Sequence, residues 1–167
     1  QVLEMVDSFL SDSEIQLPLS PNGVYDFTVD WGDGTSSRIT SWNDPDKRHD
    51  YGAAGTYTVS ISGIFSEFTM IDVSNFQVTA APWKLVDVVK WGDNKWFKAK
   101  NMFAHSGIAA FSATDTPDFS NVKDMSGMFM GAAYFNQSIA FDTSTVTNMS
   151  NMFNMAVSFN KQITFNT

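Results

Sequence analysis

The first half of the chain alternates apolar and polar residues with a period of two. The segments VYDFTVDW (24–31) and GTYTVSISG (55–63) show this alternation and are rich in β-branched and aromatic residues, which is typical of half-buried strands. Asp33-Gly34 follows the first segment and favours a hairpin, because glycine adopts positive φ without strain. A weaker strand is expected over residues 14–19. Short strands separated by turn signals predict an antiparallel β-sandwich.

The second half of the chain contains an internal repeat. The segment PDFSNVKDMSGMFMGAAYFNQSI (117–139) aligns with FDTSTVTNMSNMFNMAVSFNKQI (141–163) at an offset of 24 residues. Both copies share a Met-x-x-Met-Phe pattern, an Ala three positions later and a Phe-Asn pair after it. A degenerate earlier copy runs from Leu85 to about Phe111. Recurrence of this kind indicates stacked units, each of which needs its neighbour to bury an apolar face.

Within one repeat the large side chains recur at helical spacing. In the last copy they step by 3, 1, 3 and 3 residues, which predicts one face of a short helix. The β-branched triplet 145–147 before it predicts a strand, so each copy reads as one coil of an α/β solenoid. The repeat side chains expected to be buried are Met128, Phe129, Ala132, Phe135, Met152, Phe153, Ala156 and Phe159.

Charge divides the chain at about the same place as the pattern. Residues 1–75 hold 12 acidic and 3 basic residues, whereas residues 76–167 hold 6 and 7. We therefore predict a β-sandwich over residues 1–81 and a solenoid over residues 82–167, the latter with a leading segment and about three repeats. The fold class is β-rich, mixed α+β.

Composition excludes several functional classes. The net charge of −8 argues against broad, charge-driven binding of nucleic acid, which needs a basic surface. The absence of cysteine excludes disulfides, thiolate metal sites and a cysteine nucleophile. No apolar run approaches the ~20 residues of a membrane span, so no membrane insertion is expected within this chain. The chain starts without methionine or a leader, which is expected of a mature or excised piece.

Two stretches resemble known families. WGDGT (31–35) followed by His49, Tyr51 and GTYTV (55–59) resembles the PKD-like β-sandwich. The repeats SNVKDMSGMF and STVTNMSNMF resemble the BspA-like leucine-rich repeat of bacterial surface proteins. The resemblance implies an extracellular bacterial surface protein that binds a host or neighbouring-cell protein or glycan, without enzymatic activity. It also implies a structural role for His49.

The candidate chemistry is sparse, and each motif has a plain structural interpretation beside the functional one. The aspartates near residues 30–33 and 44–50 could gather around calcium, but no ligand loop of known spacing is present. Turn and surface roles are therefore favoured, and no metal or cofactor is predicted. Five lysines and four aromatic residues interleave over residues 83–100. These residues could bind an acidic partner or a glycan. The structural interpretation is that the lysines are the solvated face of the first coil and the tryptophans fill the junction between the domains.

We expect a non-enzymatic cell-surface segment for adhesion or for protein or glycan binding. The recognition residues are expected at positions that alternate with Val122 and Val146, namely Asn121, Lys123, Thr145 and Thr147. Two alternatives are a structural spacer that displays other domains and an accessory module of a secreted hydrolase. Because no polar cap follows Phe165, weak self-association through the C-terminal coil is also expected.

Overall fold

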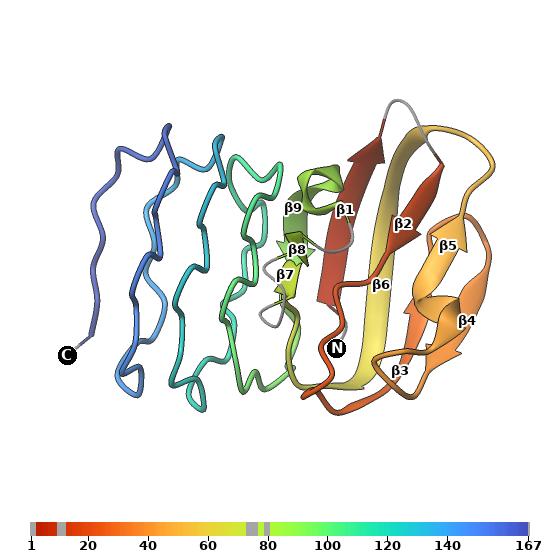
Figure 1. Ribbon diagram of the computed structural model, residues 1–167, viewed down its shortest axis with the longest axis horizontal. Coiled ribbons are helices and arrows are strands. Elements are labelled where there is room, and N and C mark those ends of the chain that lie inside the picture. The colour runs from red at the N-terminus through yellow and green to blue at the C-terminus, as the bar shows by residue number, and fades with distance from the viewer. Residues whose placement is uncertain (1–2, 10–12, 73–76, 79–80, 167) are drawn as a thin grey trace.

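The structure, a computed structural model, describes residues 3–9, 13–72, 77–78 and 81–166. It is β-rich and its antiparallel sheets do not close; apart from two short 3-10 helices, these residues contain no helix (Figure 1). The elements are β1 (Leu3–Phe9), β2 (Glu14–Gln16), β3 (Tyr25–Asp30), β4 (Ser36–Ile39), η1 (Pro45–Lys47), β5 (Arg48–Asp50), β6 (Gly55–Phe65), β7 (Ile71–Asp72), β8 (Gln77–Val78), η2 (Pro82–Lys84) and β9 (Leu85–Lys90).

A five-stranded antiparallel sheet forms the first half of the molecule, in the order β4-β3-β6-β1-β9. The alternation in β3 is confirmed, since Tyr25, Phe27 and Val29 are buried and the residues between them are exposed. The Asp33-Gly34 signal is confirmed as well, because β3 and β4 pair as a hairpin around it. Two further pairs, β2–β5 and β7–β8, lie outside this sheet.

Strands β1 and β9 were not predicted, although β1 occupies an interior position of the sheet. Met5 of β1 lies opposite Val59 of β6 on one side and Val88 of β9 on the other. The pairing with β9 is irregular, with shifts in register on both sides of the Met5–Val6 step. The first half of the fold is therefore completed by a strand from beyond the predicted boundary at residues 81–82.

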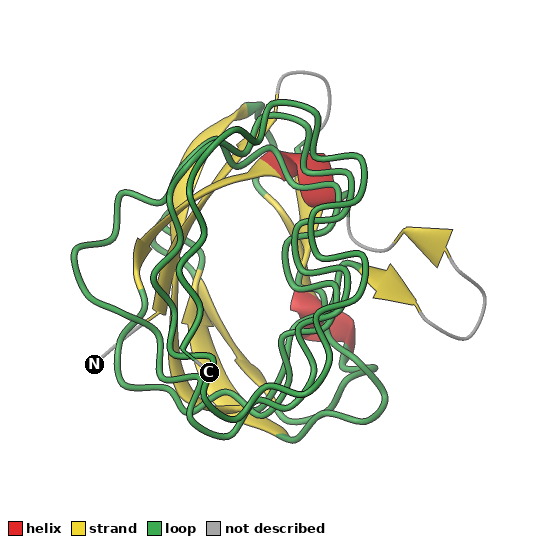
Figure 2. Cartoon of the chain, turned by 90° about the vertical axis from the view of Figure 1, so that its left-hand side faces the viewer, coloured by secondary structure: helices red, strands yellow, loops and turns green. Residues whose placement is uncertain are grey.

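The free edge of β9 is covered by the next stretch of chain. The Gly107 amide donates to the Leu85 carbonyl at 2.9 Å, and the Ala113 amide donates to the Val88 carbonyl at 3.0 Å. Strand β9 and residues 107–113 run in the same direction. The chain is therefore antiparallel on one side of β9 and parallel on the other. Residues 107–113 belong to the first of three successive turns of chain, residues 91–116, 117–140 and 141–166, which we call the first, second and third turns of the stack. They lie one on another toward the C-terminus (Figure 1). Viewed along the stack, they trace nearly the same oval outline (Figure 2).

The helix predicted in each repeat is wrong. In the second turn, amides bond to carbonyls three residues back, with Met128 bonding to Met125 and Ala132 to Phe129. Each of these hydrogen bonds closes a four-residue β-turn. Gly127 and Gly131 are the third residues of the two β-turns and have positive φ of 63° and 67°. This is the position at which a type II turn requires it. Consecutive β-turns within one repeat place the large residues three and four positions apart, which is also the spacing of one face of a helix.

The strand predicted over residues 145–147 is also wrong. No described residue beyond β9 belongs to a named strand, and the turns touch there through isolated parallel bridges such as Asp124–Asn148. Asx turns fix the backbone instead: the Ser126 amide donates to Asp124 and the Ser150 amide donates to Asn148. An Asp or Asn two positions before a Ser was the sequence signal for this geometry.

Phenylalanine rings stack from turn to turn. Phe129 lies between Phe103, at 5.7 Å, and Phe153, at 5.5 Å, and it also stacks on Phe135 at 4.1 Å between ring centroids. The predicted burial is confirmed for Met128, Phe129, Ala132, Phe135, Met152 and Ala156. Phe153 and Phe159 are only half-buried, although both pack against the core.

A side chain at Gly127 should be destabilising, because it needs positive φ and a shift of the Asn101 side chain. A Cβ at this position would lie 2.2 Å from the Asn101 Oδ1 atom of the turn below, and positive φ adds strain of ~1–2 kcal/mol. We expect Gly127→Ala to lower the free energy of unfolding by at least about 1–2 kcal/mol in urea titrations. Asn151→Gly, at the equivalent exposed position, is the control and should stay within ~0.5 kcal/mol. Equal stability of Gly127→Ala and wild type would contradict the turn assignment.

One apolar core runs through both halves of the molecule. Buried side chains form a continuous cluster from Leu3 in β1 to Met152 in the third turn. Trp91, directly after β9, makes edge-on contacts with Phe103, Phe111 and Phe119 at 5.2–5.9 Å. The domain boundary at residues 81–82 remains a prediction.

Candidate binding site

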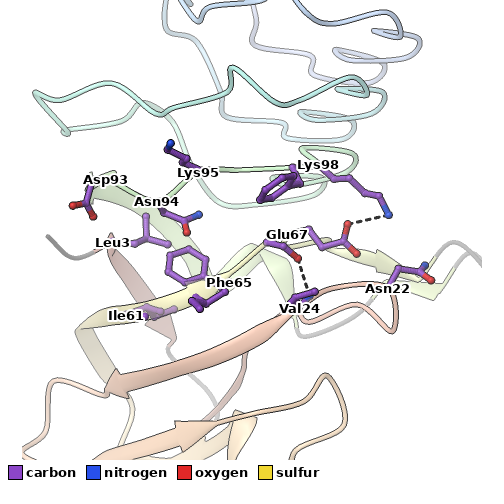
Figure 3. Close-up of a pocket in the computed structure, with 14 residues that line it drawn as sticks. Leu3, Asn22, Val24, Ile61, Phe65, Glu67, Asp93, Asn94, Lys95 and Lys98 are labelled. Atoms are coloured by element: carbon purple, nitrogen blue, oxygen red, sulfur yellow. Dashed lines mark hydrogen bonds and ion pairs between the residues drawn. The ribbon is translucent and has the colours of Figure 1, made fainter.

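A hollow lies where the five-stranded sheet meets the first turn of the stack. It has a volume of about 610 Å³ and is open to solvent (Figure 3). The end of β6, the start of β1 and the segment before β3 form one side, and residues 93–98 form the other. We call this hollow the junction cavity.

The walls of the junction cavity are largely apolar. Leu3, Ile61 and Phe65 are buried side chains whose edges face it. Three large apolar residues around it are solvent-exposed, namely Val24 (64%), Ile64 (60%) and Phe97 (56%). Eight large apolar side chains are exposed among the described residues, and three of them lie around this one cavity. Exposed apolar surface is therefore concentrated there.

A few polar groups border these walls. The Lys98 Nζ atom lies 3.2 Å from the Glu67 carboxylate, whose side chain is nearly buried (Figure 3). The Phe97 amide donates to the Ser66 carbonyl at 3.1 Å and ties the first turn to the end of β6. Lys95 is exposed on the rim. The cavity can therefore take an apolar group in its walls while polar atoms at the rim fix its orientation.

The interleaved lysines and aromatic residues of positions 83–100 divide between structural and surface roles. Trp91 and Trp96 are buried in the core at the junction, as the structural interpretation expected. Lys84 is buried too, and its Nζ atom donates to the Glu14 carbonyl. Only part of this run, including Phe97 and Lys98, faces the junction cavity.

The predicted recognition residues lie on neighbouring turns of the stack. Asn121, Lys123 and Thr147 are exposed, whereas Thr145 is half-buried. The Thr145 hydroxyl donates to the Val122 carbonyl at 2.9 Å, and the Thr147 hydroxyl donates to the Lys123 carbonyl at 3.2 Å. The two threonine hydroxyl donors thus link adjacent turns. Their role in recognition remains a prediction.

A second polar cluster surrounds His49 of β5. Its ring stacks on Trp31 at 4.7 Å and meets Tyr51 edge-on at 4.5 Å. The His49 Nε2 atom lies 2.7 Å from an Asp33 carboxylate oxygen, and the other oxygen accepts from the amide and hydroxyl of Thr35. The cluster joins the β3–β4 hairpin to β5 and thus has a structural role.

Asp33 should contribute to stability in a pH-dependent way. Hydrogen bonds from Thr35, and then from His49, lower the pKa of Asp33 from 3.8 to about 2. Because the folded pKa is depressed, the contribution is complete above pH ~4 and is lost as the pH falls through about 2. We expect Asp33→Asn to be less stable than wild type at neutral pH in urea titrations, and the difference to be lost as the pH falls through about 2. A difference independent of pH would contradict this account.

The aspartates considered for calcium accept hydrogen bonds from nearby chain. Asp30 accepts from the Gly32 amide, Asp44 from the Thr40 and Asp46 amides, and Asp50 from Ser13 and the Gly52 amide. Within the described residues, no three His, Asp or Glu side chains are placed to hold a metal ion together. These carboxylates thus have turn and loop roles.

Comparison with known proteins matched part of the chain. Residues 97–167 match a family model described as "Mycoplasma protein of unknown function, DUF285". No curated protein and no solved structure matched the chain. Separately, no helix in the described ranges is long and apolar enough to cross a membrane.

This match corrects the resemblance drawn from the sequence. The matched family is DUF285, and neither the BspA-like leucine-rich repeat nor the PKD-like sandwich is supported. The motifs behind the resemblance have local causes. WGDGT and His49 form the hairpin cluster, and the Met-Phe repeats follow from type II turns and stacked rings.

Proposed function

We propose that this chain is a non-enzymatic binding module of a bacterial cell surface that takes up a protein or glycan partner at the junction cavity. The observation that carries the proposal is the cavity of about 610 Å³ with exposed Val24, Ile64 and Phe97 around it. Ligand sites are typically concave hollows of ~300–1,000 Å³ with apolar walls and few polar groups. Grouped exposed apolar side chains mark interaction surfaces.

The proposal includes a finer architecture. Residues 1–81 would form a β-sandwich, and residues 82–167 a short solenoid without α-helices whose first coil is covered by the sheet. The hydrogen bonds from Gly107 and Ala113 to β9 support this arrangement. The description of the matched family, which names Mycoplasma, supports a bacterial source. The nearly charge-free polar surface after Met125 supports a recognition role outside the cell.

A structural spacer is the second candidate function. It is favoured by the continuous core from β1 to the third turn, which would make a stiff unit. A spacer needs no partner at the junction cavity. Binding experiments therefore separate the two functions.

The test is a binding screen with the immobilised chain against host matrix proteins and glycans. We expect at least one partner to bind, and Phe97→Ala and Ile64→Ala to weaken that binding about tenfold or more, as anchor residues do. Tyr134→Ala, which removes another exposed aromatic ring outside the cavity, is the matched control and should bind like wild type.

Two results would count against this function. If no partner binds, the spacer is favoured. If a partner binds equally well to the cavity variants, recognition lies elsewhere. Lys123→Ala and Thr147→Ala then test the polar positions predicted from the sequence.

A further inference from the structure

A row of four backbone amides connects each turn of the stack to the next. Their positions are two residues apart, and each amide donates to a carbonyl of the following turn. From the first to the second turn, the pairs are Ala99–Asp124, Asn101–Ser126, Phe103–Met128 and His105–Met130. From the second to the third turn, they are Met125–Asn148, Gly127–Ser150, Phe129–Met152 and Gly131–Asn154, with N···O distances of 2.8–2.9 Å.

The third turn repeats this geometry on its outward face. Asn151 and Met155 have positive φ of 56° and 60°, like the glycines at the equivalent positions of the second turn. The equivalent amides belong to Met149, Asn151, Phe153 and Met155. Within the described residues no acceptor is found for these four amides. This outward row therefore presents donors at the spacing that the two inner rows use.

Apolar side chains border the outward row. Phe153 stacks on Phe129 with one face, and it is half-buried where Phe129 is fully buried. Ile163 is likewise half-buried where Ile139 of the second turn is buried. Together with Met149 and Phe165, these side chains line a hollow of about 350 Å³. The outward face thus offers both hydrogen-bond donors and a surface for one more ring.

We infer that this outward face binds one further turn of the same kind, that is, a backbone segment with four carbonyl oxygens at two-residue steps and an aromatic ring to lie on Phe153. The same contact forms twice within the molecule, between the first and second turns and between the second and third. The surface is separate from the junction cavity.

Two contacts by which a second copy of this chain could cover the outward face are unfavourable. Two outward faces brought together by a twofold axis would place N–H donors opposite N–H donors. The first turn of another copy is also covered, since the Met70 amide donates to the Asn101 carbonyl and the Phe97 amide donates to the Ser66 carbonyl. Neither the outward face nor the first turn of a second copy is therefore complementary to this row of amides.

The inference is tested by extending the chain. Because Thr167 lies 24 positions after Thr143, a copy of residues 144–167 is added directly after it. We expect hydrogen exchange at the four outward amides to slow about tenfold or more, as formation of a hydrogen bond implies. An extension with the same residues in shuffled order is the matched control and should leave their exchange unchanged. Exchange in β3 and β6 shows that both chains fold.

The inference would be overturned if the four outward amides exchanged equally fast in the chain with the copied extension and in the chain with the shuffled one, whether both rates are slow or both are fast. Sedimentation of the chain without an extension provides a second measurement. Over a concentration series, we expect sedimentation to show a monomer. Hydrogen exchange at the four outward amides should stay fast at every concentration. A dimer that protects these four amides would show that a second copy is the occupant, and would also overturn the inference.

Discussion

Replacing Phe129 by alanine should lower the free energy of unfolding by about 3–5 kcal/mol, the usual loss for a phenylalanine removed from a core. The ring has no exposed surface and lies against Phe103, Phe135 and Phe153. Its removal leaves a cavity in the middle of the ring stack, and the neighbouring turns cannot close it without breaking the hydrogen bonds between them. Urea titration of wild type and variant measures the loss.

Tyr134→Ala provides the control for the Phe129 experiment. Tyr134 lies in the same turn and is 68% exposed, so its removal should change stability by no more than ~0.5 kcal/mol. If Phe129→Ala also stayed within ~0.5 kcal/mol, the alignment of the second and third turns would be wrong.

Replacing Trp91 by alanine should have a comparable effect, about 3–5 kcal/mol. Trp91 is buried at the end of β9 and packs edge-on against four phenylalanine rings of the stack. Its amide also donates to the Asp115 carboxylate at 3.0 Å. The variant therefore weakens the core where the sheet passes into the stack, which makes it a probe of how the two halves are coupled.

Hydrogen exchange in the Trp91 variant tests that coupling. If one core unites the halves, amides in β3 and β6 should lose as much protection as amides in the turns. Wild type compared with Trp91→Ala under identical conditions gives the difference for each amide. Faster exchange in the turns alone, with β3 and β6 unchanged, would show two units that unfold separately. That result would support the boundary at residues 81–82.

The strands that could be predicted from the sequence are those with one buried face. In β3 and β6, alternation alone identifies the buried residues, such as Phe27 and Ile61. β9 pairs with β1 and is covered by the stack on its other edge, and its burial does not alternate. Its environment is set by residues far away in the chain, which local patterns cannot report.

The repeat was visible in the sequence, but its backbone conformation was not. Spacings of three and four residues fit a helix, and they fit consecutive four-residue turns equally well. What distinguishes the two is the conformation of Asn101, Gly127 and Asn151, which all have positive φ. An α-helix does not accept that conformation in its interior. An Asn or Gly recurring at one position of the repeat was therefore the signal for turns.

The junction cavity could not be predicted, because its walls come from distant segments of the chain. Val24, Ile64 and Phe97 carry no motif, and each alone is an ordinary exposed apolar residue. Only the pairing of β3 with β6 and the contact of Phe97 with Ser66 bring them together. The four predicted positions on the stack followed from alternation along a strand that does not form.

The interior position of β1 has a consequence for folding, because its two partner strands lie far from it in the chain. β1 is made before its partner β9, which follows after most of the sheet has been synthesised. Closing that long loop is entropically demanding, and contacts of this kind slow folding. Each later turn bonds to a neighbour close in sequence, as Gly127 does to Ser150. We therefore expect closure of the sheet to be slower than the formation of the contacts between turns.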